Sequence, residues 1–223
     1  MRRAANILRR YVLSLCGAAA LLLLGLLCIA PLANAADAIP QHAARYRADL
    51  TRCARLYWGF EAPVATFAAQ VHQESRWRED ARSPVGAQGL TQFMPATAMW
   101  MGNVDPELAG AQPFNPGWAL RALAAYDRWL WERVRASTPC DRMAMALSAY
   151  NGGLGWIAKD KAMAARNGYE PLDWFDSVES FNSGRNAAAF RENRHYPRRI
   201  LYELEPLYHD AGWGKGACDA YYQ

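Results

Sequence analysis

The sequence predicts an all-α fold, with one globular domain behind a distinct N-terminal segment. Three observations predict it. Apolar residues recur at helical spacing along most of the chain, and Pro, Gly and capping residues are spaced as helix ends are. No stretch shows the sustained alternation of apolar and polar residues expected of a half-buried strand. With 223 residues, of which 52% are hydrophobic and 21% charged, the chain is long enough to bury one substantial core.

Residues 1–35 differ in composition from the rest of the chain. They begin with four arginines, continue as an apolar run over residues 11–30, and end on Ala33-Asn34-Ala35, the small-x-small pattern that a signal peptidase cleaves. We therefore expect a signal peptide and an exported, periplasmic protein. The alternative is a retained inner-membrane anchor, because residues 11–30 are just long enough to span a bilayer.

The charge balance gives no reason to expect a nucleic-acid partner. The formal net charge is +4, but residues 1–35 contain four arginines and no acid, so the remainder is neutral (4 minus 4). A neutral domain lacks the excess of cationic side chains that binding to a phosphate backbone requires. Contact with a membrane is expected only through an uncleaved leader.

Three cysteines follow the leader: Cys53, Cys140 and Cys218. An oxidising compartment allows one disulfide and leaves one free thiol, and the sequence alone does not choose the pair. Their wide separation argues against a metal cluster. We expect neither a metal nor a cofactor.

The pattern divides the chain after the leader into a linker at residues 36–42, a helical domain at residues 43–210 and a tail at residues 211–223. The first helix is expected at residues 43–58, and Pro63 suits the first turn of the second, where its missing N–H costs nothing.

Two helix starts are predicted in the middle of the chain, where a capping residue is followed by a proline: Asn115-Pro116 and Thr138-Pro139. The first should run to about residue 135, and the second should stop at Gly152-Gly153. Further helices are expected at residues 154–166 and 197–208.

Glu74 is the first candidate for catalysis. Val64, Phe67 and Val71 recur at helical spacing, and the next position on that face is Glu74. A carboxyl group in apolar surroundings either finds a partner or holds its proton to unusually high pH, which suits general acid catalysis. Taken alone, the stripe does not exclude an ordinary surface acid on a frayed helix end.

The loop after Glu74 carries neutral hydrogen-bonding groups. Residues 82–92 contain two glycines, which adopt backbone conformations that other residues resist, together with Ser83 and Gln92. Hydroxyl and amide groups of this kind suit the hydroxyls and amides of sugars. A short helix follows Met94.

Three motifs, in order, resemble the signature of lytic transglycosylases, the lysozyme-fold enzymes of bacterial cell walls. The first contains Glu74-Ser75, Ser83, the string GAQGLTQ at residues 86–92 and PATA at residues 95–98. The second is AYNGG at residues 149–153, and the third runs from Glu192 to Ile200, with a Glu four residues before a Tyr. The resemblance covers residues 67–200 and implies a lysozyme-like fold with an active-site cleft.

The resemblance also implies a reaction. Glu74 would protonate the glycosidic oxygen between N-acetylmuramic acid and N-acetylglucosamine in peptidoglycan, and would then act as the base for the muramyl 6-hydroxyl. That hydroxyl attacks the anomeric carbon and gives a 1,6-anhydro product. An internal nucleophile needs no second carboxylate, which agrees with the single acid in the first motif, whereas most glycosidases use two. Glu79 and Asp80 lie in a charged stretch that indicates a solvated turn.

Further roles follow from the resemblance. Ser83 would assist the muramyl N-acetyl group, Glu192 would brace the active-site wall, and Tyr196 would lie close to Glu74. The residues expected to line the sugar groove are Ser83, Gln92, Met94, Tyr150 and Asn151. A surface ion pair with Arg191 or Arg194 is the alternative role for Glu192. For Tyr150 the alternative is a plain core aromatic.

Three positions depart from the family pattern: Thr91 replaces the usual Met, and Asn193 and Pro197 replace Thr and Val. If Thr91 lines the groove, a smaller and more polar wall would alter which peptide-substituted strands fit.

The sequence also bears on three other functions. His72-x-Glu74 resembles the His-x-Glu of zinc deaminases, but that motif needs a further Cys three positions after Cys140, where the chain has Met143. A lysozyme-like muramidase that admits water stays open. A non-catalytic peptidoglycan-binding component of a secretion, conjugation or phage machine also stays open. An active enzyme could serve such a machine too, by opening local gaps in the wall.

Overall fold

The computed structural model describes residues 38–218, so the expected signal peptide or anchor and residues 219–223 of the expected tail lie outside the described part. The helices within it are η1 (Gln41–Tyr46), α2 (Arg47–Trp58), α3 (Val64–Ser75), α4 (Pro95–Trp100), η2 (Met101–Asn103), η3 (Pro106–Leu108), α5 (Pro116–Arg133), α6 (Pro139–Gly152), α7 (Leu154–Arg166), η4 (Val178–Ser180), α8 (Ala187–Arg198), η5 (Arg199–Leu204) and α9 (Glu205–Asp210).

The all-α prediction is confirmed over residues 38–218, where extended pairing is limited to the isolated bridges of Gln88 with Arg82 and with Phe93. No helix in this part of the chain is long and apolar enough to cross a membrane. The first residues of the expected linker, up to Pro40, precede η1, which already begins at Gln41.

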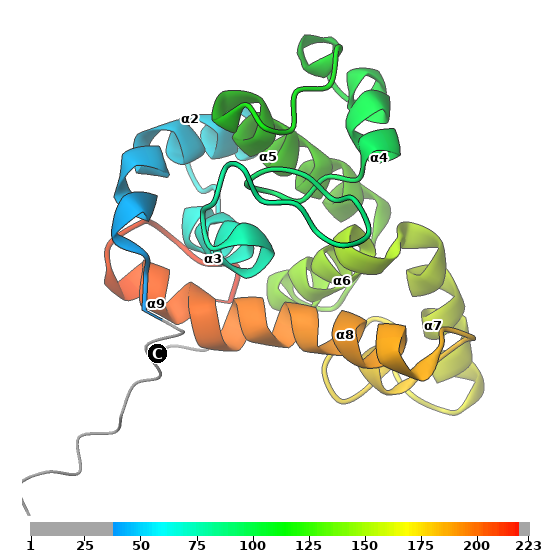
Figure 1. The fold of residues 1–223 in the computed structure, drawn as a ribbon. Helices are drawn as coiled ribbons and strands as arrows, with labels where there is room; N and C mark the ends of the chain where they lie inside the picture. The colour runs from blue at the N-terminus through cyan, green and yellow to red at the C-terminus, as the bar shows by residue number, and fades with distance from the viewer. Residues whose placement is uncertain (1–37, 219–223) are drawn as a thin grey trace, which may run out of the picture. The chain divides into compact units, whose positions relative to one another are not determined.

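Helix α3 forms the centre of the domain, as Figure 1 shows. Ten of its 12 residues are buried, which is the pattern of a helix surrounded by protein on nearly all sides. Helices α2, α9 and η5 pack against it. Glu74 is next to its last residue, where the helix reaches the edge of the core.

The predicted caps of α5 and α6 are confirmed. Asn115 Oδ1 accepts hydrogen bonds from the backbone N–H groups of Gly117 at 2.9 Å and Trp118 at 3.3 Å. Thr138 Oγ1 accepts from the N–H of Asp141 at 3.0 Å, and prolines follow both caps. These contacts satisfy amide groups that have no partner within the helix. The helix expected at residues 154–166 has those same bounds.

The expected helix start at Pro197 is wrong. The helical segment begins ten residues earlier, where Asn186 caps α8 by accepting from the N–H of Ala189 at 2.9 Å. Pro197 lies inside α8 and is followed by η5, a π-helix. Proline has no N–H for the helical ladder and its ring crowds the preceding turn. A wider π-turn is one way in which a helix accommodates such an interruption.

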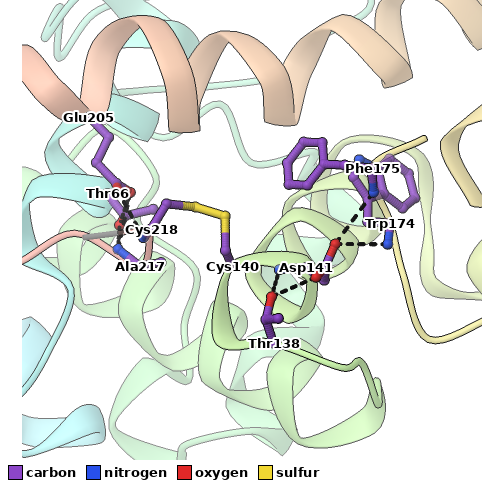
Figure 2. The surroundings of a disulfide bond; sticks show 9 residues. All are labelled: Thr66, Thr138, Cys140, Asp141, Trp174, Phe175, Glu205, Ala217 and Cys218. Atoms are coloured by element: carbon purple, nitrogen blue, oxygen red, sulfur yellow. Dashed lines mark hydrogen bonds between the residues drawn. A yellow bond between two sulfur atoms is a disulfide. The ribbon is translucent and has the colours of Figure 1, made fainter. Parts of the chain in front are cut away.

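The C-terminal segment packs on the domain through residue 218. A disulfide joins Cys140 to Cys218 and leaves Cys53 as a free thiol, which identifies the pair that the sequence left open. Beside the disulfide, Glu205 accepts hydrogen bonds from the N–H groups of Ala217 at 3.2 Å and Cys218 at 3.0 Å (Figure 2). The disulfide therefore ties the first turn of α6 to the segment that follows α9.

Candidate active site

Glu74 lines a cavity of about 380 Å³. All eight residues predicted for the site border this cavity: Glu74, Ser83, Gln92, Met94, Tyr150, Asn151, Glu192 and Tyr196. They come from α3, the loop before α4, the end of α6 and the middle of α8. The structure thus places residues of α6 and α8, which are distant in the sequence, beside α3 and the loop that follows it.

The carboxyl group of Glu74 is partly buried and has one close partner, the hydroxyl of Tyr196, which donates to Glu74 Oε1. Burial raises the pKa of Glu74 to about 8, against the lowering effect of the Tyr196 hydrogen bond and with a further rise from the negative charge of Glu192. Glu74 is therefore mostly protonated at neutral pH. The surface-acid alternative does not apply.

The loop at residues 82–92 is held against α3 by a buried hydrogen bond, since Ser75 Oγ donates to the carbonyl of Leu90 at 2.7 Å. Within the loop, Ser83 Oγ accepts from the N–H of Ala87 at 2.9 Å. The amide of Gln92 donates to the carbonyls of Gly89 at 2.8 Å and Ala81 at 3.2 Å. Ser83 and Gln92 thus shape the loop as well as bordering the cavity.

Gly89 is required by the loop's geometry. Its φ is +76°, a left-handed conformation that glycine adopts without strain, and a Cβ added there would lie 1.7 Å from the carbonyl oxygen of Pro113. The segment before α5 therefore presses directly on the loop backbone.

Tyr150 packs in the core and also borders the cavity. Its ring packs against Phe93 and Tyr126, with centroids 5.7 and 5.4 Å away. Its hydroxyl donates to the carbonyl of Thr91 at 2.7 Å. The ring belongs to the core and its edge borders the cavity, as expected of an amphipathic aromatic side chain.

Thr91 does not line the cavity, so it cannot form the smaller and more polar wall that the sequence suggested. Its side chain is fully buried, its hydroxyl donates to the carbonyl of Ala119 at 3.4 Å, and it does not border the cavity. At this position the Thr side chain therefore packs behind the loop and forms no part of the cavity wall.

Glu192 is exposed at the cavity rim and accepts a hydrogen bond from Asn151 Nδ2 at 3.4 Å. Arg194, one of its two alternative partners, instead pairs with the buried Asp160 at 2.7 Å. The carboxylate of Glu192 is thus a second acid at the cavity, which the sequence placed in the wall and left without chemistry.

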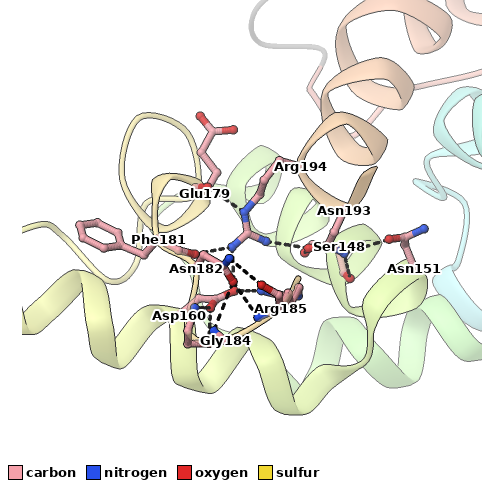
Figure 3. A network of polar contacts seen from close by, with 11 residues as sticks. Ser148, Asn151, Asp160, Glu179, Phe181, Asn182, Gly184, Arg185, Asn193 and Arg194 are labelled. Atoms are coloured by element: carbon pink, nitrogen blue, oxygen red, sulfur yellow. Dashed lines mark hydrogen bonds and ion pairs between the residues drawn. The ribbon is translucent and has the colours of Figure 1, made fainter. Parts of the chain in front are cut away.

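Asn193, noted in the sequence only as a departure from the family pattern, positions Asn151. It is buried, and its Nδ2 donates to Asn151 Oδ1 at 3.0 Å and to the carbonyl of Ser148 at 2.8 Å. Its Oδ1 accepts from the Ser148 hydroxyl at 2.8 Å and from Arg194 at 2.6 Å. Figure 3 shows this network between α6 and α8.

Sequence reasoning missed one carboxyl group near the site. Asp127 on α5 is fully buried, and its charge would interact with that of Glu74. The signal was available, because Leu123, Asp127 and Leu130 recur at helical spacing, the same pattern that singled out Glu74. Glu79 and Asp80, in contrast, are exposed as expected and lie outside the cavity. Within residues 38–218, no group of three His, Cys, Asp or Glu side chains could hold a metal ion.

Comparison with known proteins gives consistent matches. Residues 56–173 match the family described as the transglycosylase SLT domain. Membrane-bound lytic murein transglycosylase F of Mannheimia succiniciproducens is 30% identical over 165 residues, which cover 72% of this chain and 29% of the relative. The protein of the same name from Maricaulis maris is 38% identical over 113 residues, covering 50% and 23%. The chain thus matches less than a third of the length of these relatives.

Two solved structures share the fold. One is the 70 kDa soluble lytic transglycosylase from Escherichia coli, with a TM-score of 0.53 and 22% identity over 74% of this chain and 24% of that one. The other is an inactive mutant of the lytic transglycosylase Slt from Pseudomonas aeruginosa, with a TM-score of 0.54 and 23% identity over 77% and 25%. These likenesses confirm the lysozyme-like fold that the motifs implied.

Proposed function

We propose that this chain, which belongs to the transglycosylase SLT domain family, cleaves the β-1,4 bonds between N-acetylmuramic acid and N-acetylglucosamine in peptidoglycan glycan strands. The observation that carries the proposal is the partly buried Glu74, whose pKa of about 8 keeps its proton available at neutral pH. A proton donor in a groove with hydroxyl and amide groups suits glycosidic bond cleavage. The names of the relatives, lytic murein transglycosylases, support the substrate class.

In the proposed reaction, Glu74 gives its proton to the glycosidic oxygen as the bond from that oxygen to the anomeric carbon breaks. The ionised Glu74 then takes the proton of the muramyl 6-hydroxyl while its oxygen bonds to the anomeric carbon. The product carries a 1,6-anhydro ring, and Glu74 is protonated again. Tyr196 would hold the carboxyl group in one orientation, and its burial raises the pKa of its hydroxyl, which therefore stays a donor.

The remaining cavity residues would bind the sugar rings and their N-acetyl groups. Ser83 is proposed to assist the muramyl N-acetyl group. Asn151, positioned by Asn193, would offer its amide to the strand. Gln92, Met94 and Tyr150 would form the walls, and Glu192 would brace the side opposite the loop through its contact with Asn151.

The second candidate function is that of a muramidase, and Glu192 is the observation that favours it. Hydrolases of this kind use a second carboxylate to activate water, and Glu192 borders the same cavity as Glu74. The anhydro route is preferred because Glu192 is exposed at the rim and already accepts a hydrogen bond from Asn151.

The mass of the products of murein digestion separates the candidates. A transglycosylase yields muropeptides lighter by one water at the reducing end, whereas a muramidase yields the full reducing sugar. The Glu74→Gln variant keeps the shape of the side chain and removes the titratable group, so it is expected to lose activity by at least about a thousandfold. Undiminished clearing of murein by this variant would leave a non-catalytic peptidoglycan-binding component as the better account.

The cellular setting is proposed from the composition of residues 1–35. The protein would act in the periplasm, either released after cleavage near residue 36 or held at the inner membrane by residues 11–30. There it would open local gaps in the wall for an envelope-spanning secretion or conjugation machine. N-terminal sequencing of the exported protein tests the cleavage, and co-purification from cross-linked envelopes tests the partner.

A further inference from the structure

A second carboxyl group, Asp127, lies in the core near Glu74. Its side chain is fully buried on α5, and Gln70 Nε2 donates to Asp127 Oδ1 at 3.4 Å. Gln70 is fully buried too and precedes Glu74 by four residues on α3. The side chains of Gln70 and Glu74 therefore share one face of that helix. Neither Gln70 nor Asp127 borders the cavity.

Two oxygens of this pair are left over. In the described part of the chain, Asp127 Oδ2 and Gln70 Oε1 are both buried and neither has a hydrogen-bond partner. If Asp127 were ionised, both atoms would be acceptors and could not satisfy each other. A proton on Oδ2 makes it a donor, and Gln70 Oε1, the other buried oxygen of this pair without a partner, is an acceptor that complements it. A planar carboxylic acid and a planar amide can then bond reciprocally.

The charges around Asp127 also disfavour its ionised form. Burial raises the pKa of Asp127 well above its ordinary value, the hydrogen bond from Gln70 lowers it, and the charge of Glu74 raises it further. The groups whose charges interact with Asp127 are acids from four helices: Glu74 on α3, Tyr126 on α5, Tyr150 on α6 and Tyr196 on α8. No basic side chain in residues 38–218 forms an ion pair with Asp127.

We propose that Asp127 is a neutral carboxylic acid whose Oδ2 hydroxyl donates to Gln70 Oε1, and that this reciprocal acid–amide pair is a positioning device for Glu74. The pair joins α5 to α3 one turn before Glu74. Because the charge of Glu74 opposes ionisation of Asp127, Asp127 stays neutral and Glu74 is the acid of this cluster that changes charge during the reaction. The positioning role rests on the proposed function of Glu74, whereas the protonation state of Asp127 does not.

Infrared spectroscopy of the full chain tests the protonation state. The spectrum of Glu74→Gln at pH 7, minus that of Glu74→Gln/Asp127→Asn, is expected to contain the C=O stretch of a protonated carboxyl group. Glu74 contributes nothing in either protein. A carboxylate stretch in the difference spectrum, with no carboxylic acid band, would overturn the proposal whatever the activity of the enzyme.

Matched variants test the positioning role. Asp127→Asn can still bond reciprocally with Gln70, whereas Asp127→Leu fills the space but leaves both polar groups of Gln70 unpaired. We expect Leu to lower the Tm by roughly 5 °C and kcat on a soluble glycan fragment by about tenfold, with KM changed less than about twofold. Asn is expected to restore kcat to within about threefold of the native value.

The alkaline limb of the pH profile supplies a further readout. Because Asn replaces a neutral acid with a neutral amide, the limb of Asp127→Asn should coincide with that of the native protein. A limb that moves to lower pH would mean that a negative charge had been removed, and would contradict a neutral Asp127. Equal impairment of the Asn and Leu variants would contradict the reciprocal pair. If the native protein cleaves no murein, the proposed function fails, and the infrared result still decides the state of Asp127.

Discussion

At the scale of single residues, the environment of Glu74 sets its chemistry. The carboxyl group of an exposed glutamate is ionised at neutral pH, but burial raises the pKa of Glu74 to about 8. Two neighbours act on it in opposite directions: the hydrogen bond from Tyr196 stabilises the ionised form, and the charge of Glu192 destabilises it. Both the rate and the stability of the protein should therefore depend on pH in ways that can be traced to named atoms.

The first prediction concerns stability. The folded-state pKa of Glu74 is raised above the unfolded value of 4.5, so the folded state binds the proton more tightly. The contribution is fully present below pH 4.5 and is lost as the pH rises through about 8. Glu74→Gln does not titrate, so its Tm relative to that of the native protein should increase between pH 5 and pH 8. Thermal unfolding across this range measures the difference, and a constant difference would contradict the raised pKa.

A pair of substitutions should move the alkaline limb of activity in opposite directions. Tyr196→Phe removes a hydrogen bond that lowers the pKa of Glu74, so Glu74 should stay protonated to higher pH. Glu192→Gln removes a negative charge that raises this pKa, so the limb should move to lower pH. The measurement is kcat/KM for a glycan fragment between pH 5 and pH 9. Loss of the orienting hydroxyl should also reduce kcat of Tyr196→Phe about tenfold.

The same Glu192→Gln variant separates the two candidate reactions. In the anhydro route Glu192 is a wall residue, and the variant should retain substantial activity. A loss as large as that of Glu74→Gln, together with products that carry the full reducing sugar, would identify Glu192 as the base of a muramidase.

At the scale of elements, the loop between α3 and α4 is shaped by close backbone contacts. Ser75 ties it to α3, and Gly89 touches the chain before α5 at a point where no side chain fits. Farther along, Pro197 and the π-helix η5 interrupt the ladder next to Tyr196. Such interruptions often occur near functional sites, and here the interruption follows directly after the residue that holds Glu74.

Two glycines of this loop form a matched comparison. Gly86 and Gly89 both have positive φ, of +94° and +76°, but an added Cβ meets nothing within 4 Å at Gly86 and the carbonyl of Pro113 at Gly89. Gly86→Ala should cost about 1 kcal/mol from backbone strain alone. Gly89→Ala should cost at least about 3 kcal/mol and displace the loop, with loss of activity. Urea unfolding and the rate of murein cleavage measure both effects, and equal costs would show that the contact with Pro113 yields easily.

At the scale of the whole molecule, the C-terminal segment closes the domain. After α9 the chain returns across the start of α3, where the carbonyl of Lys215 accepts from the N–H of Ala65 at 3.0 Å. Trp213 packs between Trp77 and Tyr208, with centroids 5.3 and 5.0 Å away. The disulfide then connects this segment to α6, 78 residues earlier. The expected tail is therefore packed on the domain up to residue 218, with Trp213 and Cys218 in the core.

Reduction of this disulfide should destabilise the protein by about 2–4 kcal/mol, because the cross-link restricts the unfolded chain over a long loop. Cys140→Ser/Cys218→Ser is expected to lower the Tm by roughly 5–15 °C. Cys53→Ser, which removes the free thiol, is the control and should leave the Tm within about 2 °C. Differential scanning calorimetry under non-reducing conditions makes the comparison. A double variant as stable as the native protein would contradict a structural role for the bond.

Local signals explain why several elements were predictable. The caps at Asn115 and Thr138 act within three residues of themselves, so their pattern indicates the start of α5 and α6 before the chain folds. The start of α8 was missed because a proline such as Pro197 often marks the start of a helix, and Asn186, unlike Asn115 and Thr138, is not followed by one. A proline inside a helix is tolerated only when tertiary packing compensates for the lost hydrogen bond.

The sequence by itself determined the helical class and most helix starts, because these depend on periodicity and caps. It singled out Glu74 by helical spacing, and the resemblance of its motifs to a family predicted the other residues that border the cavity. The tertiary structure alone decided the Cys140–Cys218 pair, the burial of Thr91 and the contact of Asn193 with Asn151. It also decided the pairing of Asp127 with Gln70, 57 residues apart. Each of these is a contact between distant segments, and the free energy of a buried polar or charged group depends on which partner the fold brings to it.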